Sequence, residues 1–368
     1  MNRGLQHTPE ETADWGFALF RQPYARECTL ISGPVSICND IEQLTDAQGF
    51  VMAPFAPTQQ EPVVVIHPEK MLRGLRPDTI DANSIVVALD ELPAPAEHTD
   101  ARGDYHADFA DFHAQLSSGS FQKLVLARSV VWPREEPVAK TMSGDGRSAS
   151  QHLQLFQQAC MRYPRMFVCL VFTPQSGLWL AATPETLLAG EGDRWQTMAL
   201  AGTMPWQENI AWSDKNLQEQ RYVATYISRL LERFTDDFAE RGPYTTRAGH
   251  LAHLRSDFLF SLPHSASIGQ LISMLHPTPA VCGLPKEEAI RFILGHEHGE
   301  RSYYSGFMGP FGLNGSTHLF VTLRCMRIFS NACRLYAGGG LLTDSVEEQE
   351  WQETEAKLDT MRRLLAGC

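Results

Sequence analysis

The chain has 368 residues, of which 43% are hydrophobic and 20% charged, a composition typical of a soluble globular enzyme rather than of a disordered or fibrous protein. The formal net charge of −12, without a clustered stripe of Lys and Arg, argues against nucleic-acid binding, because phosphate neutralisation requires such clusters. No apolar run approaches the roughly 18 residues of a membrane span, and residues 1–7 lack the apolar region of a signal peptide. We expect neither a nucleic-acid nor a membrane partner.

The cysteines are scattered through the chain without a CxxC pair, which favours reduced thiols and a cytoplasmic protein. No coiled-coil pattern or exposed apolar helix is evident, so we expect a monomer. Residues 1–100 contain two predicted strands, over 62–66 and 84–89, separated by proline-rich loops, and nothing that suggests catalysis.

The next segment begins with apolar residues at helical spacing over 104–116 and continues as a predicted strand over 121–128. Lys123 lies inside that strand. The charged stretch 134–150, rich in Ser and Gly, is typical of a surface loop.

Consecutive hairpins are predicted in the middle of the chain. A helix over 152–162 precedes strands over 166–172 and 178–182, and another strand follows over 195–200. Hairpins in succession imply antiparallel sheet rather than a repeated βαβ unit. We therefore expect one large α+β unit of antiparallel sheets flanked by helices, with residues 1–100 as its N-terminal part and residues 101–368 as its catalytic region.

The second half contains a helix that begins after Ser213, a good N-cap, and extends to about Phe234. Glu219 lies on the same face as the apolar residues of this helix, so its carboxylate points inward. Further along we predict a strand from His250, a helix over 268–275, a rigid loop over 276–285, a helix over 286–294 and strands over 302–311, 318–327 and 332–336.

The C-terminal segment combines glycines 338–340, predicted to form a turn, with a helix over 346–365. At roughly 100° per residue, Glu350, Glu353 and Lys357 continue the stripe that faces the core. Burying unpaired carboxylates costs several kcal/mol each, so this helix requires a metal, a cationic ligand or paired lysines.

Two interpretations of these carboxylates remain open. Glu219, Glu350 and Glu353 are hard oxygen ligands suited to Mg²⁺. Alternatively they form internal ion pairs at i,i+4 spacing, Glu353 with Lys357 and Glu219 with Lys215. His296 and His298 lack a third ligand at metal-binding spacing and favour a polar surface loop.

Two further residues stand out on chemical grounds. Lys123 is a lone lysine in an apolar strand: it is a candidate base if buried, and a solvent-facing residue otherwise. Glu185 follows a proline at a strand end, where a partly buried carboxyl could remain protonated as a general acid, or simply be solvated.

Taken together, these blocks resemble the chorismate-utilising enzymes, and within them most closely the isochorismate synthases. The resemblance extends from about Phe121 to the C-terminus. It is carried by the blocks 123–128, 183–188, 199–203, 215–219, 276–285, 304–306, 323–324, 338–340 and Glu350-x-x-Glu353-x-x-x-Lys357.

The resemblance implies a large α+β fold that binds chorismate with Mg²⁺ between its sheets. It implies that Lys123 acts as general base on a water that attacks C2, and that Glu185 acts as general acid on the departing C4 hydroxyl. Glu219, Glu353 and Glu350 would hold Mg²⁺. The residues implied to bind substrate are Gly202, Thr203, His253, Ala280, Tyr304, Arg324, Gly338, Gly340 and Lys357.

A few positions favour one reaction within the family. Lys123 and Ala201 differ from the residues typical of the aminating relatives, and Ala280 differs from the threonine typical of salicylate synthases. Asn216 stands where several relatives carry an acid. A salicylate synthase and a non-catalytic chorismate-binding homologue are the alternatives. For the product, the menaquinone pathway is preferred over siderophore synthesis without support from any residue.

Overall fold

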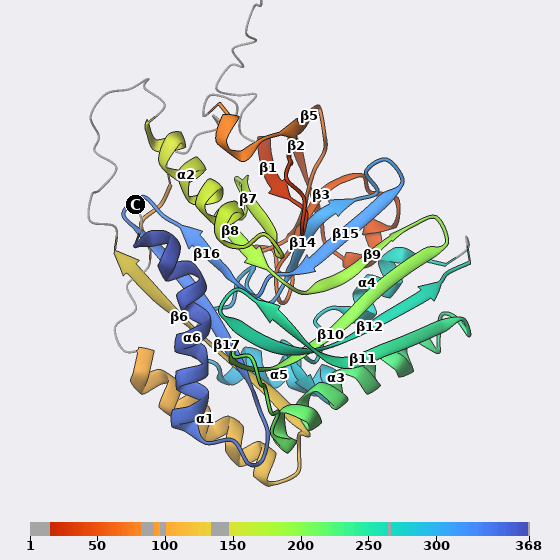
Figure 1. The fold of residues 1–368 in the computed structure, drawn as a ribbon, viewed down its shortest axis with the longest axis vertical. Coiled ribbons are helices and arrows are strands. Elements are labelled where there is room, and N and C mark those ends of the chain that lie inside the picture. Colours follow the sequence, from red (N-terminus) through yellow and green to blue (C-terminus); the bar gives the residue numbers. More distant parts are fainter. Residues whose placement is uncertain are drawn as a thin grey trace, which may run out of the picture.

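The computed structural model describes residues 15–81, 85, 92–95, 101–133, 147–263 and 266–366. Its strands form two antiparallel sheets, joined by the long strand β2 (Cys28–Cys38), which pairs with β1 and β5 in the first sheet and with β4 in the second (Figure 1). The α+β prediction with antiparallel sheets is confirmed.

The first sheet brings the N-terminal strands next to the C-terminal ones. Its remaining strands, in spatial order from β2, are β1 (Trp15–Arg21), β7 (Phe167–Thr173), β8 (Gly177–Thr183), β16 (Cys325–Ile328), β17 (Ala332–Leu341), β6 (Lys123–Pro133) and β13 (Gly283–Leu284), with β5 (Lys70–Leu75) on the other side of β2.

The second sheet continues from the far end of β2. In spatial order it contains β4 (Val63–Ile66), β3 (Gly49–Ala53), β14 (Phe307–Phe311), β15 (Ser316–Val321), β9 (Thr186–Glu191), β10 (Arg194–Pro205), β12 (Leu251–Ser261) and β11 (Phe238–Ala248).

The helices cover the outer faces of the two sheets. Buried side chains of α2 (Arg147–Arg162) and α6 (Glu347–Leu365) pack on the first sheet, and those of α3 (Asp214–Leu231) and α4 (Ile268–Leu275) pack on the second. A third cluster of apolar residues fills the space between the sheets. The helices α1 (Ala101–Ser117) and α5 (Lys286–His296) pack together against β6. The site residues therefore lie within a sandwich of two sheets between helices.

Local sequence signals explain the helices that carry site residues. The Ser213 hydroxyl accepts a hydrogen bond from the backbone N–H of Asn216 and caps α3. Val223 and Ile227 of α3 are buried on the same face as Glu219, as predicted. In α6, Glu350 and Lys357 are buried on the face that continues into Met361 and Leu364.

Several predicted elements differ from the structure. Glycines 338–340 lie inside β17 rather than in a turn, because their lack of side chains admits neighbouring groups rather than a chain reversal. Residues 302–306 form turns, with positive φ at Ser302 and Ser305, so β14 begins only at Phe307. The strand predicted over 318–327 is two strands, since residues 322–324 leave the ladder.

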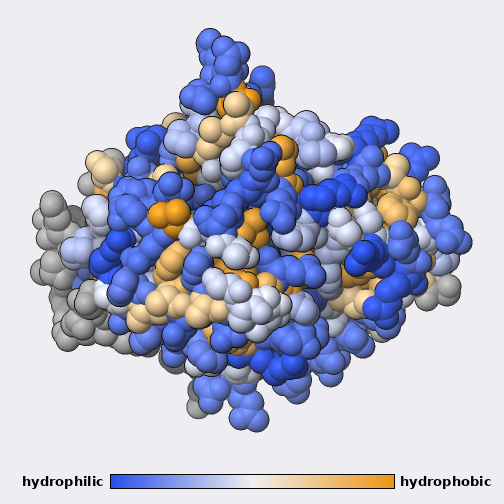
Figure 2. Space-filling view, turned by 90° about the horizontal axis from the view of Figure 1, so that it is seen from below, coloured by the Kyte–Doolittle hydropathy of each residue, from blue (hydrophilic) through white to orange (hydrophobic). Residues whose placement is uncertain are grey.

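Two other predictions fall partly outside the described residues. Most of the strand expected over 84–89, and residues 134–146 of the expected loop, lie outside them, whereas α2 already begins at Arg147. Among the described residues, no helix combines the length and apolar character that crossing a membrane requires. The face that carries the lower helices of Figure 1 is mostly hydrophilic, with apolar residues in small separate groups (Figure 2).

Candidate active site

A small polar cavity of about 40 Å³ lies between the two sheets. Strands β6 and β17 of the first sheet and β10 and β12 of the second contribute to its wall, together with α3 and α6. Its lining includes eleven of the residues predicted from the sequence: Glu185, Gly202, Thr203, Glu219, His253, Ala280, Tyr304, Arg324, Gly338, Gly340 and Lys357.

The other three predicted residues, Lys123, Glu350 and Glu353, do not line the cavity, although Lys123 and Glu353 each contact a residue that does. The Nζ of Lys123 lies 3.1 Å from Oε1 of Glu219, and the lysine side chain is fully buried. A Cβ on Gly340 would approach Oε1 of Glu219 to 2.0 Å and Cε of Lys123 to 3.0 Å. Glycine at this position therefore makes room for the buried ion pair.

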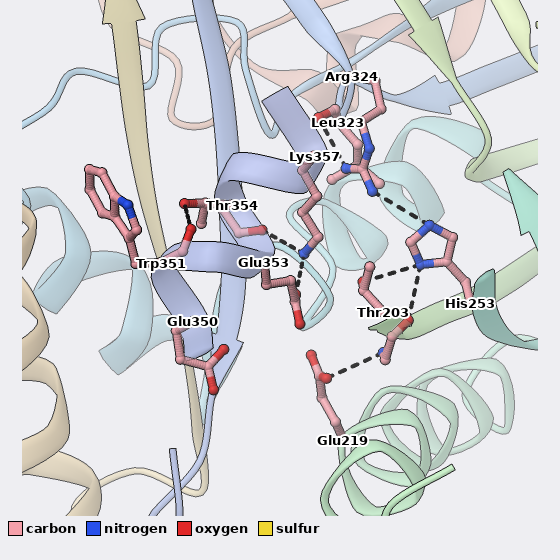
Figure 3. Close-up of polar contacts among 12 residues, drawn as sticks. Thr203, Glu219, His253, Leu323, Arg324, Glu350, Trp351, Glu353, Thr354 and Lys357 are labelled. Carbon is pink, nitrogen blue, oxygen red and sulfur yellow. Dashed lines mark hydrogen bonds and ion pairs between the residues drawn. The ribbon is translucent and has the colours of Figure 1, made fainter. Parts of the chain in front are cut away.

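The carboxylates of α6 are each held by a lysine. Lys357 Nζ lies 2.6 Å from Glu353 Oε1 and also donates to the carbonyl of Gly338 at 2.7 Å (Figure 3). Glu350 forms a short ion pair with Lys215 of α3. The predicted pair of Glu353 with Lys357 is confirmed. The pair of Glu219 with Lys215 is wrong, because Lys123 of β6 pairs with Glu219 and Glu350 of α6 pairs with Lys215.

The pKa values of two buried carboxylates, Glu219 and Glu350, are shifted in opposite directions. Burial alone would raise the pKa of Glu219, but the ammonium groups of Lys123, Lys357 and Lys215 outweigh it and hold that pKa below its ordinary value. Burial and the nearby Glu353 raise the pKa of Glu350, which the single contact with Lys215 only partly opposes. Glu219 is therefore an anion at neutral pH.

Glu185 is different because neither of its carboxyl oxygens has a hydrogen-bond partner among the described residues. Its side chain is fully buried at the end of β8. Burial raises its pKa to about 8, although the charges of Lys123 and Arg324 and the nearby hydroxyl of Thr278 oppose the shift. The carboxyl is thus mostly protonated at pH 7 and can act as an acid.

His253 contributes a neutral ring to the opposite side of the cavity. Burial, with the charges of Arg324 and Lys357, lowers the pKa of His253 well below its usual value. Its Nδ1 lies 3.0 Å from the carbonyl of Gly202, whereas Nε2 lies 3.5 Å from an Arg324 nitrogen, which can only donate. Figure 3 shows the contacts of both ring nitrogens. The proton therefore resides on Nδ1, and Nε2 is an acceptor.

Two cavity residues present groups suited to an organic anion. Arg324 is buried, and no carboxylate within the described part of the chain forms an ion pair with it. The Tyr304 hydroxyl would lie 2.8 Å from a Cβ on Gly338, so that glycine lets the phenol reach the cavity; burial raises the pKa of Tyr304 to about 12 and keeps it a donor. A planar carboxylate suits an arginine and a phenol placed together.

Comparison with known proteins identifies the family. A family model described as chorismate binding enzyme matches residues 87–366. The chain belongs to the chorismate-binding enzymes.

Relatives within the chorismate-binding enzymes support a common architecture. Isochorismate synthase MenF of Escherichia coli (strain K12) is 30% identical over 312 residues, which cover 79% of this chain and 69% of MenF. Isochorismate synthase DhbC of Bacillus subtilis (strain 168) is 29% identical over 275 residues, covering 71% and 67% of the two chains. The solved structure of MenF, the menaquinone-specific isochorismate synthase from Escherichia coli, superimposes with a TM-score of 0.75 at 22% identity, covering 96% of this chain and 89% of that one, and shows the shared fold.

Sequence reasoning missed the apolar part of this cavity, which consists of Val125, Leu200, Val281 and Leu323. These side chains look like ordinary core residues. The only available signal was position: Val125 lies two residues after Lys123 in β6, so both point to the same side of the sheet.

The prediction of a polar surface loop around His296 is only partly correct. Glu297 is not a surface-loop residue but is buried, and its carboxylate forms an ion pair with Arg301 at 2.5 Å. Arg301 also donates to the carbonyls of Val125 and Val281, both at 2.7 Å. His298 is paired with Asp108 instead of a metal. The Glu297–Arg301 pair therefore fixes two walls of the pocket.

The expected metal ligands suit Mg²⁺ in chemistry but do not form a closed cage. Among the described residues, no group of three His, Cys, Asp or Glu is gathered closely enough to hold a metal ion. A Cβ on Gly339 would lie 3.5 Å from Glu350 and 3.6 Å from Glu353, whereas Glu219 approaches Gly340. Mg²⁺ usually takes one or two protein carboxylates and completes its shell with water and substrate oxygens, so this donor set fits.

Proposed function

We propose that this chorismate-binding enzyme is an isochorismate synthase, which adds water at C2 of chorismate and releases the C4 hydroxyl. The observation that carries the proposal is that Glu185, a buried carboxyl with a raised pKa and no hydrogen-bond partner among the described residues, lines the same small cavity as Glu219, which contacts the buried Lys123. Such a pair can give one proton and take another within the same site. The names of the relatives MenF and DhbC support the same reaction.

Glu185 would supply the acid. Its protonated carboxyl donates to the C4 oxygen as the carbon–oxygen bond breaks, so that water leaves instead of hydroxide. The absence of hydrogen-bond partners for its oxygens, among the described residues, leaves this proton available to a substrate. The high pKa allows the carboxyl to carry a proton at pH 7.

Lys123 would supply the base. In its neutral form its amine accepts a proton from the water that bonds to C2, while both ring double bonds shift and the C4 oxygen departs. The ion pair with Glu219 must loosen before the lysine can take that proton. One water enters and one leaves, and the proton passes back from Lys123 to Glu185 to complete the cycle.

The anionic substrate would be held by donors and cations that line the pocket. Arg324 and Tyr304 suit the carboxylate of the enolpyruvyl arm, and Lys357 faces the same cavity. Glu219 and Glu353, with Glu350 directly or through water, would hold Mg²⁺. When bound, Mg²⁺ supplies positive charge opposite the ring carboxylate.

Two small residues support isochorismate as the final product. Ala201 and Ala280 line the cavity, where the aminating relatives and the salicylate synthases typically carry larger polar groups. A salicylate synthase would form isochorismate as an intermediate and eliminate pyruvate from it. The relatives include proteins of both menaquinone and siderophore synthesis, which share this reaction, and menaquinone remains the preferred pathway.

Incubation of the purified protein with chorismate and Mg²⁺, followed by separation of the products, tests the proposal. We expect isochorismate without salicylate. Salicylate with pyruvate would indicate a salicylate synthase, and an aminated product with ammonia would indicate an aminating relative. Calorimetric binding of chorismate without any turnover would indicate a non-catalytic homologue.

A further inference from the structure

A second and larger cavity adjoins the candidate active site. It measures about 320 Å³, against about 40 Å³ for the catalytic cavity, and Leu200 lines both. Pro184 and Thr186, the neighbours of the acid Glu185, line the larger cavity. The two cavities therefore lie close together near the end of β8 and the middle of β10.

The strand register places both cavities on one face of the second sheet. Leu200 of β10 pairs directly with Arg255 of β12, so their side chains share a face. Residues two apart in a strand point to the same side, which puts His253 of the catalytic cavity on that face next to Arg255. A molecule that lies along this face passes from Arg255 to His253 without crossing the sheet.

The larger cavity is cationic in a chain whose net charge is −12. Its lining contains Arg165, Arg247 and Arg255 but no aspartate or glutamate. A neighbouring cavity of about 210 Å³ shares Arg165 and Arg247, adds Arg162, and again has no acidic lining residue. This concentration of arginines is therefore not a consequence of overall composition.

Structural roles account for only part of this arginine cluster. Arg255 is paired with Asp257 at 2.6 Å, and Arg247 donates to the carbonyl of Gly249 at 2.9 Å. Arg165 and Arg247 are exposed, and neither forms an ion pair with a carboxylate in the described part of the chain. Two cations thus remain available to an anion at the mouth of the cavity.

We propose that this cavity is the entrance through which chorismate reaches the catalytic cavity, with Arg165 and Arg247 attracting its two carboxylates. The inference depends on chorismate being the substrate of the proposed function. Clefts lined with one sign of charge raise association rates for an opposite charge by 10–10³-fold, an effect that salt weakens. The net charge of −12 disfavours the approach of a dianion, so we expect a local cationic route to have a measurable effect on association.

The test compares two double variants of equal charge change. Arg165→Glu/Arg247→Glu reverses the charge of two residues at the entrance. Arg73→Glu/Arg233→Glu makes the same charge change at two exposed arginines that line neither cavity. Stopped-flow measurements with Mg²⁺ give chorismate association and dissociation rates in a Glu185→Gln background, in which slow turnover isolates binding. Gln196→Trp replaces an exposed lining residue and narrows the cavity without changing its charge, so it complements the charge variants.

We expect the entrance variant to associate about tenfold more slowly at low salt, with a difference that shrinks as salt rises and a dissociation rate within about twofold of the parent. The control pair should match its parent. Equal association rates in the two double variants, or a loss confined to dissociation, would overturn the inference. Wild-type protein that binds chorismate but forms no isochorismate contradicts the proposed function alone, because the association rates still test the entrance.

Discussion

Glutamate side chains at the two ends of the catalytic cavity have different surroundings. At the β8 end, Glu185 is fully buried, and its oxygens have no partner among the described residues. At the end formed by α3 and α6, Glu219, Glu350 and Glu353 each contact a lysine. The difference separates a carboxyl that keeps its proton from carboxylates arranged to hold a cation.

Burial alone therefore does not decide the charge of a glutamate in this site. Glu219 and Glu185 are both deeply buried, yet the pKa of Glu219 is lowered and that of Glu185 is raised to about 8. The number of nearby ammonium groups makes the difference, since three lysines act on Glu219. The following experiments test this contrast between the two ends.

Lys123→Ala has the largest expected effect, because it removes both the proposed base and the partner of Glu219. We expect turnover to fall by about 10²–10⁴-fold, with chorismate binding largely retained. Steady-state kinetics and calorimetry measure the two quantities. Lys215→Ala is the matched control, because its lysine pairs with Glu350 rather than contributing a base. A near-normal rate in Lys123→Ala would remove the assignment of the base.

Glu185→Gln keeps the shape of the acid but removes its titratable proton. We expect turnover to fall by about 10²–10³-fold. In the wild type, kcat should decline as pH rises through about 8, because the acid loses its proton there. A pH–rate profile measures this limb. Retention of the same limb in Glu185→Gln at a normal rate would assign it to another group.

The raised pKa of Glu185 also predicts how stability depends on pH. A group whose pKa is higher in the folded state contributes stability that is fully present below its unfolded pKa and is lost as pH rises through the folded value. For Glu185 the loss occurs between its ordinary value of 4.5 and about 8. Chemical denaturation across that range should show a shallower decline in Glu185→Gln than in the wild type; identical slopes would contradict the raised pKa.

Much of the α+β architecture could be predicted because its signals are local. Hairpin turns, alternating strands and the Ser213 cap each reside in a few neighbouring residues, and α4 has the predicted bounds, 268–275. The glycines of β17 misled prediction, since they make room for side chains that are distant in the sequence, such as Glu219 beside Gly340. Their sequence neighbours contain no trace of that contact.

The candidate site was also predictable where its signals are local and not where they depend on distant contacts. The helical wheel indicated that Glu350, Glu353 and Lys357 point inward, because a helix fixes the direction of its side chains. It could not indicate that Lys215 pairs with Glu350 instead of Glu219, since that choice depends on how α3 and α6 pack. Nor could it reveal the arginine-lined cavity, whose residues come from separate strands and loops.

The proposed metal-binding end can be tested by comparing Glu353→Gln with Glu350→Gln. Glu353 contacts Lys357, a residue that lines the cavity, whereas Glu350 lies behind Gly339 and holds Lys215. We expect Glu350→Gln to weaken Mg²⁺ binding by about tenfold, as for an outer-shell group, and Glu353→Gln to weaken it more. Titration of Mg²⁺ at fixed chorismate measures both. A larger effect at Glu350 would exchange their roles.

Asn216→Asp is expected to have the smallest effect, and it tests whether charge alone tunes this end. The Cβ of Asn216 lies 3.3 Å from the position of a Cβ on Gly202, a cavity residue, so a new carboxylate would add negative charge near Glu219. It would also lie in the first turn of α3, where an acid stabilises a helix by about 0.3–1 kcal/mol. We expect Mg²⁺ to bind about two- to threefold more tightly, since a charge at this partly exposed position contributes less than about 1 kcal/mol. Asn216→Ala is the control: it loses the hydrogen bond of 2.7 Å with the Ser213 hydroxyl and should lower the melting temperature without tightening Mg²⁺. Equal Mg²⁺ affinity in the Asp and Ala variants would show that the contacts of Glu219 and Glu353, rather than the net charge around them, determine how this end holds a cation.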